Sequence, residues 1–415
     1  MPDAGPILYI ASELPKLSET FVYREILALR DKGIDVRVAS VNTPTDDFAR
    51  PELAEMKRSA LVVYQGGPLA VLTDAFLESI SHPIPTSITL MHAKLDALLA
   101  KKLSITGRLK AFYQSLAGLS LARRVRRLGI RHIHAHFAHV PATVAMAAAK
   151  QLSIPFSFTG HANDLFKHRS LLEKKLDRAA FVACISAWHN HWYGSVRPAK
   201  RDNRPIIRCG VDRTDFAPRP QTRGLIVSVA RLVEKKGLDT LIEACALLSA
   251  QGAEFSCHIA GDGPMRDQLT SLITRHNLAS RVTLLGPLPN DKVRDLVASA
   301  SIFCLPCRDD STGDRDGIPV ALMEAMACEV ATVSGDLPAI RELIEDRVSG
   351  RFVPGADADT LARTLRELLG SPELRKSLGV QGRKRIAQEF DLAINADRSI
   401  HALRTLGGLA ETHPT

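Results

Sequence analysis

Short apolar runs alternate along the chain with longer segments whose apolar residues recur at helical spacing. The runs have the composition and length of buried strands. They are Ile7–Ala11, Asp35–Val41, Ala60–Tyr64, His132–Phe137, Phe156–Thr159, Phe181–Ile185, Pro205–Arg208, Leu225–Ala230, Phe255–Ala260, Val282–Leu285, Ile302–Leu305 and Val330–Val333. Helical patterns lie between them, for example at Leu238–Ala250, Pro264–His276, Asp291–Ala300 and Asp357–Leu369. Because strand–helix alternation favours parallel sheets covered on both faces, the pattern predicts an α/β fold.

One interruption divides this pattern into two. The segment Val196–Gly224 is rich in Pro, Arg and Asp and is interpreted as the path between two doubly wound, Rossmann-like domains. We predict an N-terminal domain over residues 1–204, a C-terminal domain over 205–388, and a helical tail over 389–415 that can cross back to the first domain. Two such domains facing each other place their strand ends around one cleft. Since ligands bind outside the carboxyl ends of parallel strands, functional residues are expected in the loops after the strands.

The composition is that of a globular protein and indicates its size class, its location and the state of its cysteines. The chain has 415 residues, of which 45% are hydrophobic and 24% charged, enough for two domains of ordinary size. No apolar run is long enough to cross a bilayer, and Ile7–Ala11 is too short for the core of a signal peptide. We therefore expect a cytoplasmic protein. Its 7 cysteines are an odd number and lie mostly in strand-like runs, which favours reduced thiols over disulfides.

The net charge of +9 is partly concentrated in one stretch, residues 94–131. Its basic residues are Lys94, Lys101, Lys102, Arg108, Lys110, Arg123, Arg124, Arg126, Arg127 and Arg131, with Asp96 as the single acid. Leucines, Phe112 and Tyr113 are interleaved at helical spacing. Such a stretch suits an anionic membrane surface, a nucleic acid, or a pair of helices with a solvated basic face. Because no compact nucleic-acid motif accompanies it, we rank the membrane above nucleic acid and expect no nucleic-acid partner.

Two loops of the second half carry charge or glycine directly after a strand. In the first, Arg231 and Lys236 precede a helix, where a guanidinium and an ammonium can clamp a diphosphate and stabilise a leaving anion. A solvated charged turn is the alternative. In the second, Gly261 and Gly263 either allow close approach of a nucleotide or close a strand–helix unit. A dinucleotide fingerprint would need a glycine where Arg266 stands, so we discard a nicotinamide cofactor.

A turn bearing a carboxylate opens an apolar helix near the end of the second half. Asp316 precedes Gly317 and Ile318, whose N–H groups, with the helix N-terminus, can meet an anionic or hydroxyl-rich ligand. Glu324 follows about two helical turns later and can accept hydrogen bonds from a ribose diol. A plain turn before an apolar helix is the alternative. With Asp314 this segment also has the D-x-D form of some metal-dependent sugar transferases, but we assign no metal.

Histidines and a cysteine pair supply the remaining candidate chemistry. His161 lies beyond a strand end, next to a glycine, and can reach a sugar hydroxyl or a leaving oxygen; a histidine satisfied within its loop is the alternative. His132, His134 and His136 alternate on one strand and can share a face. Side chains in such a row diverge, so we expect no zinc site. The CxxC at Cys304–Cys307 lacks the second pair of a zinc ribbon, which leaves a redox role open.

Together these motifs resemble those of the retaining glycosyltransferases of family four, and within that family the bacterial exopolysaccharide enzymes of the colanic-acid type. The resemblance covers nearly the whole chain, with the motifs in the same order. They are residues 12–21 (SELPKLSETF), His134–Phe137, Phe158–Asp164, Cys209–Asp212, the Arg231/Lys236 pair, Gly261–Pro264 and the Asp316…Glu324 motif. The resemblance implies the GT-B fold, with two Rossmann-like domains facing across a cleft.

The resemblance also implies a role for each matching residue. Arg231 and Lys236 correspond to the clamp for the donor diphosphate, and Glu324 to the carboxylate that binds the ribose. Asp316 stands at the first acid of the E-x7-E motif, which contacts donor sugar hydroxyls. His161 corresponds to a histidine near the transferred sugar. The loop after the first strand, where relatives meet donor phosphate or acceptor, contributes Ser18, Glu19 and Thr20.

Two departures from the family pattern affect the donor sugar. The first acid is Asp316, one methylene shorter than the usual glutamate. The usual Gly-Phe-Gly after it reads Gly317-Ile318-Pro319. Proline lacks an N–H, so only the amides of Gly317 and Ile318 remain to meet the ligand. Pro319 itself suits the first turn of the helix. Contacts to the donor sugar are therefore expected to differ from those of other members.

We therefore predict an enzyme, a retaining glycosyltransferase of the hexosyltransferase type. It moves a sugar from a nucleoside-diphosphate sugar to a hydroxyl of a lipid-linked glycan, in exopolysaccharide or cell-surface polysaccharide biosynthesis. No cofactor and no metal are expected besides this donor. A nucleotide-sugar epimerase of the same fold and a non-catalytic sugar-nucleotide-binding subunit are the alternatives. The expected location is the cytoplasm, at the inner face of the cell membrane, with residues 94–131 as the surface that meets anionic lipid.

Overall fold

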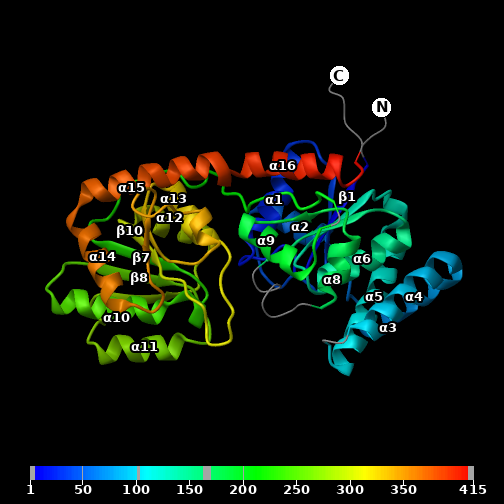
Figure 1. Ribbon diagram of the computed structural model, residues 1–415, viewed down its shortest axis with the longest axis horizontal. Helices are drawn as coiled ribbons and strands as arrows, with labels where there is room; N and C mark the ends of the chain where they lie inside the picture. The colour runs from blue at the N-terminus through cyan, green and yellow to red at the C-terminus, as the bar shows by residue number, and fades with distance from the viewer. Residues whose placement is uncertain (1–4, 49, 101–102, 162–169, 200, 410–415) are drawn as a thin grey trace, which may run out of the picture. The chain divides into compact units, whose positions relative to one another are not determined.

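The computed structural model describes residues 5–48, 50–100, 103–161, 170–199 and 201–409. Within them the chain forms two compact units (Figure 1). Unit 1 runs to Arg208 and resumes at Asn395, whereas unit 2 contains Cys209–Ile394. The boundaries expected from the sequence, at 204/205 and 388/389, lie a few residues earlier. Lys101, Lys102 and the residues of the Phe158–Asp164 loop from Ala162 onwards lie outside the described residues.

The core of unit 1 is a parallel sheet in the order β3-β2-β1-β4-β5-β6. Its strands are β1 (Ile7–Ala11), β2 (Val36–Ser40), β3 (Leu61–Val62), β4 (His132–His136), β5 (Phe156–Thr159) and β6 (Val182–Ala183). The helices are α1 (Thr20–Asp31), α2 (Pro51–Ser59), α3 (Gly67–Ser81), α4 (Pro83–Leu99), α5 (Ile105–Val125), η1 (Arg126–Leu128), α6 (Val140–Leu152), α8 (Leu172–Arg178) and α9 (Ala187–Val196). The predicted strand Pro205–Arg208 is wrong, because Ile206 forms just an isolated bridge to Cys184.

Unit 2 contains a second parallel sheet in the order β12-β11-β10-β7-β8-β9. Its strands are β7 (Leu225–Val229), β8 (Ser256–Ala260), β9 (Val282–Gly286), β10 (Ile302–Leu305), β11 (Ala331–Gly335) and β12 (Arg351–Val353). The helices are η2 (Glu234–Lys236), α10 (Leu238–Ala250), α11 (Arg266–Arg275), α12 (Asn290–Ser299), α13 (Val320–Ala327), η3 (Ile340–Glu342), α14 (Ala358–Gly370), α15 (Pro372–Arg385) and η4 (Ile386–Phe390). The edge strand β12, with 3 residues, was not predicted, because it is too short to show a pattern. Two parallel, helix-covered sheets confirm the predicted α/β class.

The continuous apolar runs become strands because both faces of each sheet are covered. In β1, side chains alternate between the two faces. Ile7 and Tyr9 pack into a core cluster that also holds residues of α1 and of the C-terminal helix. Leu8 and Ile10 pack into another cluster, with residues of α5 and α6. A strand buried on both sides must be apolar at nearly every position, which is why the sequence pattern located it.

The C-terminal helix α16 (Leu392–Thr405) joins unit 1 from Asn395 onwards. The side-chain oxygen of Asn395 accepts a hydrogen bond from the backbone N–H of Arg208 at 2.9 Å. Ser399 donates to a carboxylate oxygen of Glu25 on α1 at 3.2 Å, and Ile400 is buried in the same core cluster as Ile7. The end of the chain therefore completes the core of unit 1.

Helices α3, α4 and α5 pack against one another in unit 1 (Figure 1). We refer to α3 and α4, residues 67–99, as the α3–α4 hairpin. It begins and turns at Pro68 and Pro83, each at the first positions of its helix, where a missing N–H costs nothing. None of the helices in the described parts of the chain combines the length and apolarity of a membrane span.

Candidate functional site

Three of the functional residues expected in unit 2 lie in the loops after β7 and β10. They are Arg231, Lys236 and Asp316. Arg231 follows β7 and is exposed, whereas Lys236 ends η2 with its side chain 15% exposed. Gly237 comes next with φ of 66°. A Cβ atom at Gly237 would lie 2.1 Å from the backbone oxygen of Pro306, in the loop after β10. Glycine therefore allows the two loops to meet and brings Lys236 to the carboxylate of Asp316.

Asp316 is the centre of a charged cluster. Its Oδ2 lies 2.8 Å from Nζ of Lys236, and its Oδ1 lies 3.5 Å from Nζ of Lys235. The same Nζ of Lys235 lies 3.2 Å from Oδ2 of Asp314. The thiol of Cys307 donates to Oδ2 of Asp316 at 3.2 Å. We call these five residues the lysine–aspartate cluster. The structure thus brings the predicted Lys236 and Asp316 together, and it adds Lys235, Asp314 and Cys307, which the sequence analysis did not assign to this site.

Pairing keeps the cluster charged in spite of its burial. Burial favours the neutral form of Asp316, but the ammonium groups of Lys236 and Lys235 outweigh it and lower the pKa of that carboxyl. Burial also disfavours charge on Lys236, yet the Asp316 carboxylate raises the pKa of this amine overall. Arg231 has the opposite effect and lowers the pKa of Lys236. The two lysines thus supply two positive charges to the carboxylates of Asp314 and Asp316.

The three missed residues left weak signals in the sequence. Lys235 is adjacent to Lys236, and only the tertiary structure shows that both amines reach Asp316. Cys307 belongs to the CxxC considered for redox chemistry. Burial, followed by the Asp316 charge, holds the pKa of the Cys307 thiol well above its ordinary value, and burial does the same for Cys304. Since the thiolate is the reactive form, this environment disfavours a redox role.

The second carboxylate of the motif, Glu324, lies on α13 and is 7% exposed. Pro319 is the N-cap residue of α13, one position before the helix. The expectation that it occupies the first turn is therefore wrong. Among the described residues, no acceptor takes a hydrogen bond from the N–H of Gly317 or Ile318. Because buried N–H groups are rarely left unpaired in proteins, these two amides fit the role of ligand contacts.

The glycines after β8 hold two loops together. Gly261 donates its N–H to the backbone oxygen of Gly286 at 2.8 Å, and Leu232 donates to the backbone oxygen of Asp262 at 2.9 Å. A Cβ atom at Gly261 would lie 1.9 Å from the backbone oxygen of Ala230. A Cβ atom at Gly263 would lie 2.6 Å from that of Leu232. Both glycines therefore serve the packing that positions the loop carrying Arg231 and Lys236.

Gly261→Ala is expected to destabilise unit 2 by roughly 3 kcal/mol or more, because a backbone oxygen occupies the place of the new methyl group and φ is 134°. The matched control is Gly370→Ala, where no atom lies within 4 Å of a Cβ. Hydrogen exchange of the β7 and β8 amides in the full chain measures the effect. Protection that is equal in the two variants would show that the loop packing does not constrain Gly261.

In unit 1, His161 lies beyond β5 and is buried, with 8% exposure. Its ring centroid lies 4.5 Å from that of Phe21 on α1 and 4.9 Å from that of Phe137 after β4. Its Nε2 lies 3.3 Å from Nδ1 of His136. The structure therefore places His161 at the carboxyl ends of β4 and β5, where the sequence analysis expected functional residues.

The loop after β1 carries the other predicted residues of unit 1. Ser18 is exposed, Glu19 is the N-cap residue of α1, and Thr20 begins this helix. A carboxylate oxygen of Glu19 lies 3.9 Å from Nζ of Lys16. Phe21, the next residue, contacts the His161 ring. The loop after β1 and the residue after β5 are thus close neighbours at one edge of this sheet.

Below His161, polar side chains form a buried row on one face of the sheet. Ser157 lies 2.7 Å from Nε2 of His132 and 2.7 Å from Nδ1 of His134, which in turn contacts Thr159 at 3.0 Å. His132 also contacts the backbone oxygen of residue 407 at 3.0 Å. His132, His134 and His136 thus share one face. Both ring nitrogens of His132 and of His134 have polar partners, which explains how a buried strand tolerates these two imidazoles.

The expectation that these histidines diverge is wrong for two of them. Possible ligand atoms of Glu25, His134 and His136 all lie within 4.8 Å of one another. Glu25 also lies 3.4 Å from Nε2 of His136 and accepts a hydrogen bond from Tyr9 at 2.9 Å. Burial raises the pKa of Glu25, but contacts with the two histidines and Tyr9 outweigh it and lower the pKa to about 2. The Glu25 carboxylate and the two imidazoles therefore form a compact, largely buried group in which the histidines favour the charged form of Glu25.

Acidification is expected to destabilise unit 1. Burial lowers the pKa of His132 to about 4 and those of His134 and His161 well below their ordinary value of 6.5. The unfolded chain takes up these protons near pH 6.5, and the folded unit does not. The unfolded state therefore binds more protons, so stability falls as the pH decreases from about 6.5 toward 4. At pH 5, His132 alone accounts for roughly 2 kcal/mol.

Tryptophan fluorescence can follow this loss in the full chain. Both tryptophans, Trp188 and Trp192, lie in unit 1, so urea unfolding curves at pH 7 and pH 5 report on this unit. His132→Gln should reduce the pH dependence, whereas the matched His401→Gln, at an exposed position of α16, should not. A free energy of unfolding that is the same at both pH values contradicts the expectation.

Comparison with protein families and relatives shows which parts of this chain resemble known proteins. The family model described as "Glycosyl transferases group 1" matches residues 213–385. A putative colanic acid biosynthesis glycosyltransferase of Escherichia coli, WcaL, is 42% identical over 180 residues, 42% of this chain and 44% of that protein. The chain thus matches less than half the length of this relative. The amylovoran biosynthesis glycosyltransferase AmsK of Erwinia amylovora is 29% identical over 396 residues, 87% of this chain and 90% of that protein.

Solved structures show the same architecture at low sequence identity. Sucrose-phosphate synthase from Thermosynechococcus elongatus matches with a TM-score of 0.72 and 18% identity, over 97% of this chain and 99% of that one. Anabaena HepE in complex with UDP-glucose matches with a TM-score of 0.71 and 16% identity, over 97% and 100%. These matches confirm the GT-B fold. The lysine–aspartate cluster lies within the residues that the family model matches.

Proposed function

We propose that the chain, which the family model of the glycosyl transferases group 1 matches over residues 213–385, is a retaining glycosyltransferase. It moves a sugar from a nucleoside-diphosphate sugar to a hydroxyl of a lipid-linked glycan in exopolysaccharide biosynthesis. The observation that carries this proposal is the pairing of Asp316 with Lys236, which lies in the loop after β7 that also carries the exposed Arg231. The names of WcaL and AmsK, both polysaccharide biosynthesis glycosyltransferases, support the pathway class.

The cationic groups of unit 2 suit a leaving diphosphate. Lys236 stays charged at neutral pH because Asp316 raises its pKa, and Asp316 holds the amine in place before any ligand arrives. Arg231 adds an exposed guanidinium that can grip two phosphate oxygens. Because these charges are already oriented, they can stabilise the negative charge that develops on the diphosphate as its bond to the sugar breaks. Glu324 is assigned to the ribose, and the amides of Gly317 and Ile318 to the donor.

The simplest way to retain the anomeric configuration is attack by the acceptor on the same face of the sugar from which the diphosphate leaves. The bond between the anomeric carbon and the diphosphate oxygen breaks, and the sugar passes through an oxocarbenium-like state. The acceptor hydroxyl forms the new bond on that face and gives its proton to the leaving phosphate. Asp316 is held between two lysines, so its role is to orient them and the donor sugar rather than to act as a nucleophile.

Unit 1 is assigned to the acceptor side. His161, whose ring contacts Phe21 and Phe137, is assigned to the transferred sugar. Burial and neighbouring histidines hold the pKa of His161 well below its ordinary value, so at neutral pH it acts as a neutral hydrogen-bonding group. Ser18 lies in the adjoining loop, and Thr20 begins α1. A lipid-linked acceptor also implies that the protein works at the inner face of the cell membrane.

The test is a transfer assay with the full chain. Panels of UDP-, GDP- and ADP-sugars are combined with lipid-linked glycan acceptors, and NMR of the product reads the anomeric configuration. We expect the anomeric configuration of the donor to be kept in the product.

Addition of EDTA should leave the rate of transfer unchanged within about twofold, because the cations of unit 2 take the place of a metal. Inverted product overturns the retaining mechanism, and an isomerised sugar formed without acceptor indicates the epimerase instead.

A further inference from the structure

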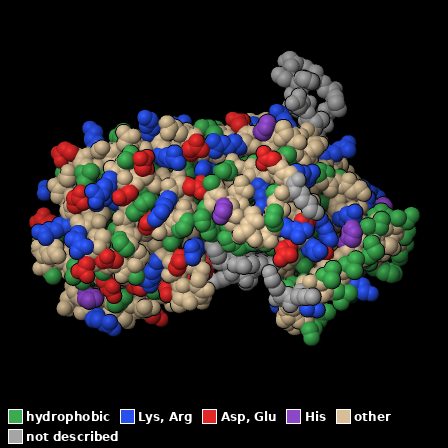
Figure 2. Space-filling view, in the orientation of Figure 1, with side chains coloured by type: hydrophobic (Ala, Val, Ile, Leu, Met, Phe, Trp, Pro, Cys, Tyr) green, Lys and Arg blue, Asp and Glu red, His purple; other side chains and the backbone are tan. Residues whose placement is uncertain are grey.

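The outer face of the α3–α4 hairpin and the first turns of α5 expose many large apolar side chains. They are Leu69, Leu72, Phe76, Leu77, Ile80, Ile84, Ile88, Met91, Leu95, Leu98, Leu99, Ile105 and Leu109. Over the remainder of the described residues, just Leu128, Val348 and Val380 are comparably exposed. Figure 2 shows the hydrophobic side chains gathered where Figure 1 places α3 and α4. A contiguous apolar surface of this kind marks an interaction site.

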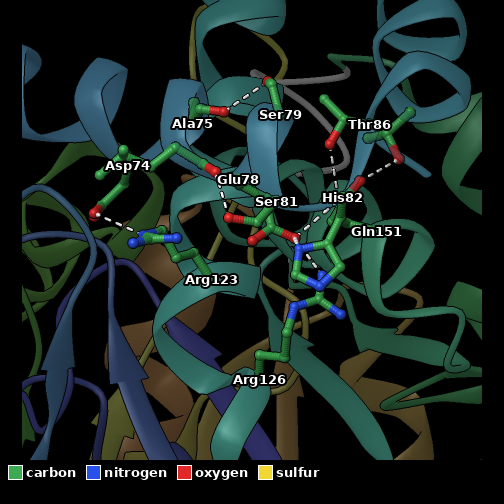
Figure 3. Close-up of polar contacts among 12 residues, drawn as sticks. Asp74, Ala75, Glu78, Ser79, Ser81, His82, Thr86, Arg123, Arg126 and Gln151 are labelled. Atoms are coloured by element: carbon green, nitrogen blue, oxygen red, sulfur yellow. Dashed lines mark hydrogen bonds and ion pairs between the residues drawn. The ribbon is translucent and has the colours of Figure 1, made fainter. Parts of the chain in front are cut away.

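The acids of the hairpin are turned away from this surface. Glu78 is buried, and it accepts hydrogen bonds from Arg126 on η1 and from Gln151 on α6, the latter at 2.9 Å (Figure 3). Asp74 accepts from Arg124 on α5 at 2.6 Å. The arrangement is the reverse of an ordinary surface helix, because here the carboxylates face inward and the leucines face outward.

The third acid of the hairpin, Asp96, is also buried and pairs through both oxygens with Arg178 of α8, at 2.5 and 2.8 Å. Asp74, Glu78 and Asp96 are the acids of this region. Consequently, no described exposed residue between positions 67 and 110 is acidic, whereas Lys94 and Lys110 are exposed. The outer face therefore combines apolar side chains with positive charge alone.

This arrangement changes the interpretation of the basic stretch 94–131. Arg124 and Arg126 point toward Asp74 and Glu78, and Nε of Arg123 lies 3.8 Å from an oxygen of Asp74. These arginines neutralise buried acids, so they do not form an open basic surface. The apolar face of the hairpin, which composition and charge did not indicate, is the larger feature of this region.

We propose that this face is the membrane seat of the protein: α3, α4 and the start of α5 lie in the plane of an anionic bilayer. Leucine, isoleucine and phenylalanine side chains enter the boundary between headgroups and acyl chains, and Lys94 and Lys110 contact lipid phosphates. Helices α3 and α4 have 15 and 17 residues, and neither has the combined length and apolarity needed to span a membrane. This inference rests on the membrane location in the proposed function and deepens it by naming the surface.

Charge favours lipid over a second copy of the chain as the occupant. Two such faces packed together would bring the lysines of both copies into an apolar contact without any acid between them, which is unfavourable. Anionic headgroups supply the missing negative charge, and the acyl region accepts the apolar side chains.

The test compares matched variants of the full chain in flotation with vesicles of phosphatidylcholine alone or mixed with phosphatidylglycerol. The triple variant Leu72→Ser/Phe76→Ser/Ile84→Ser alters side chains that are 45–75% exposed, so the fold is retained. It should reduce the partition coefficient for mixed vesicles by about tenfold or more. The control Val348→Ser/Val380→Ser changes equally apolar exposed residues of unit 2 and should bind like the wild type. Lys94→Gln/Lys110→Gln should weaken binding to the mixed vesicles alone.

The outcomes separate this proposal from the proposed function. If the triple variant floats as well as the wild type, the membrane seat is wrong. If the wild type ignores vesicles and forms a dimer that the triple variant abolishes, the occupant is a second copy and the proposal is overturned. Sugar transfer to a water-soluble acceptor should be equal in the wild type and the triple variant. A chain that floats through this face but transfers no sugar supports the seat and refutes the enzymatic assignment.

Discussion

Lys236→Ala is expected to lower the rate of sugar transfer by about a hundred- to a thousandfold at saturating donor. The Lys236 amine, 2.8 Å from Asp316, is held charged by that carboxylate. Alanine removes a preoriented cation from the place where the departing diphosphate accumulates charge. The loss should therefore appear mainly in kcat, since the interaction strengthens as the bond to the sugar breaks.

Two further variants show whether this loss is specific to Lys236. Lys292→Ala, at an exposed position of α12, removes the same charge away from the site and should leave the rate unchanged. Arg231→Ala should raise KM for the donor and lower kcat, because its exposed guanidinium can contact the ground-state diphosphate as well. Nucleoside-diphosphate release and product formation are measured together. A Lys236→Ala enzyme with a near-normal kcat would remove the assignment of this cluster to the diphosphate.

Asp316→Ala should destabilise unit 2 by about 3 kcal/mol. It leaves Lys235 and Lys236 largely buried, with side-chain exposures of 9% and 15%, and with Asp314 as their remaining carboxylate in the cluster. Removing one member of a buried charge pair exposes the full desolvation cost of the other. The second variant Asp316→Ala/Lys235→Met should recover part of the loss, since it removes one of the two stranded cations.

The pH dependence of this loss has a definite sign. The folded pKa of Asp316 is lowered relative to the unfolded chain, so its contribution is complete at pH 7 and disappears as the pH falls below about 4. Hydrogen exchange of unit 2 amides at pH 7 gives the difference from the wild type. Asp336→Ala is the control, because its pair with Arg341 at 2.6 Å lies on the surface and should contribute less than about 1 kcal/mol. Equal losses in both variants would contradict the argument from burial.

Local sequence patterns located part of the candidate site, but not the contacts between its loops. Arg231 and Lys236 could be located because a charged loop followed an apolar run and preceded a helical pattern. That both adjacent lysines meet Asp316, each at a different oxygen, depends on how closely Gly237 approaches Pro306. That approach joins segments distant in the sequence. Cys307 and Asp314 were missed for the same reason, since their role exists only where the two loops meet.

The sequence by itself determined where nearly all the strands lie and which loops follow them, because a parallel strand buried on both faces must be apolar at almost every position. It did not determine which face of the α3–α4 hairpin packs inward. Periodicity would bury Leu72 and Phe76 and expose Glu78, whereas the fold does the reverse. Only the tertiary structure supplies the physical reason: Arg126 and Gln151 neutralise and hydrogen-bond the buried carboxylate, which leaves the apolar side chains to face outward.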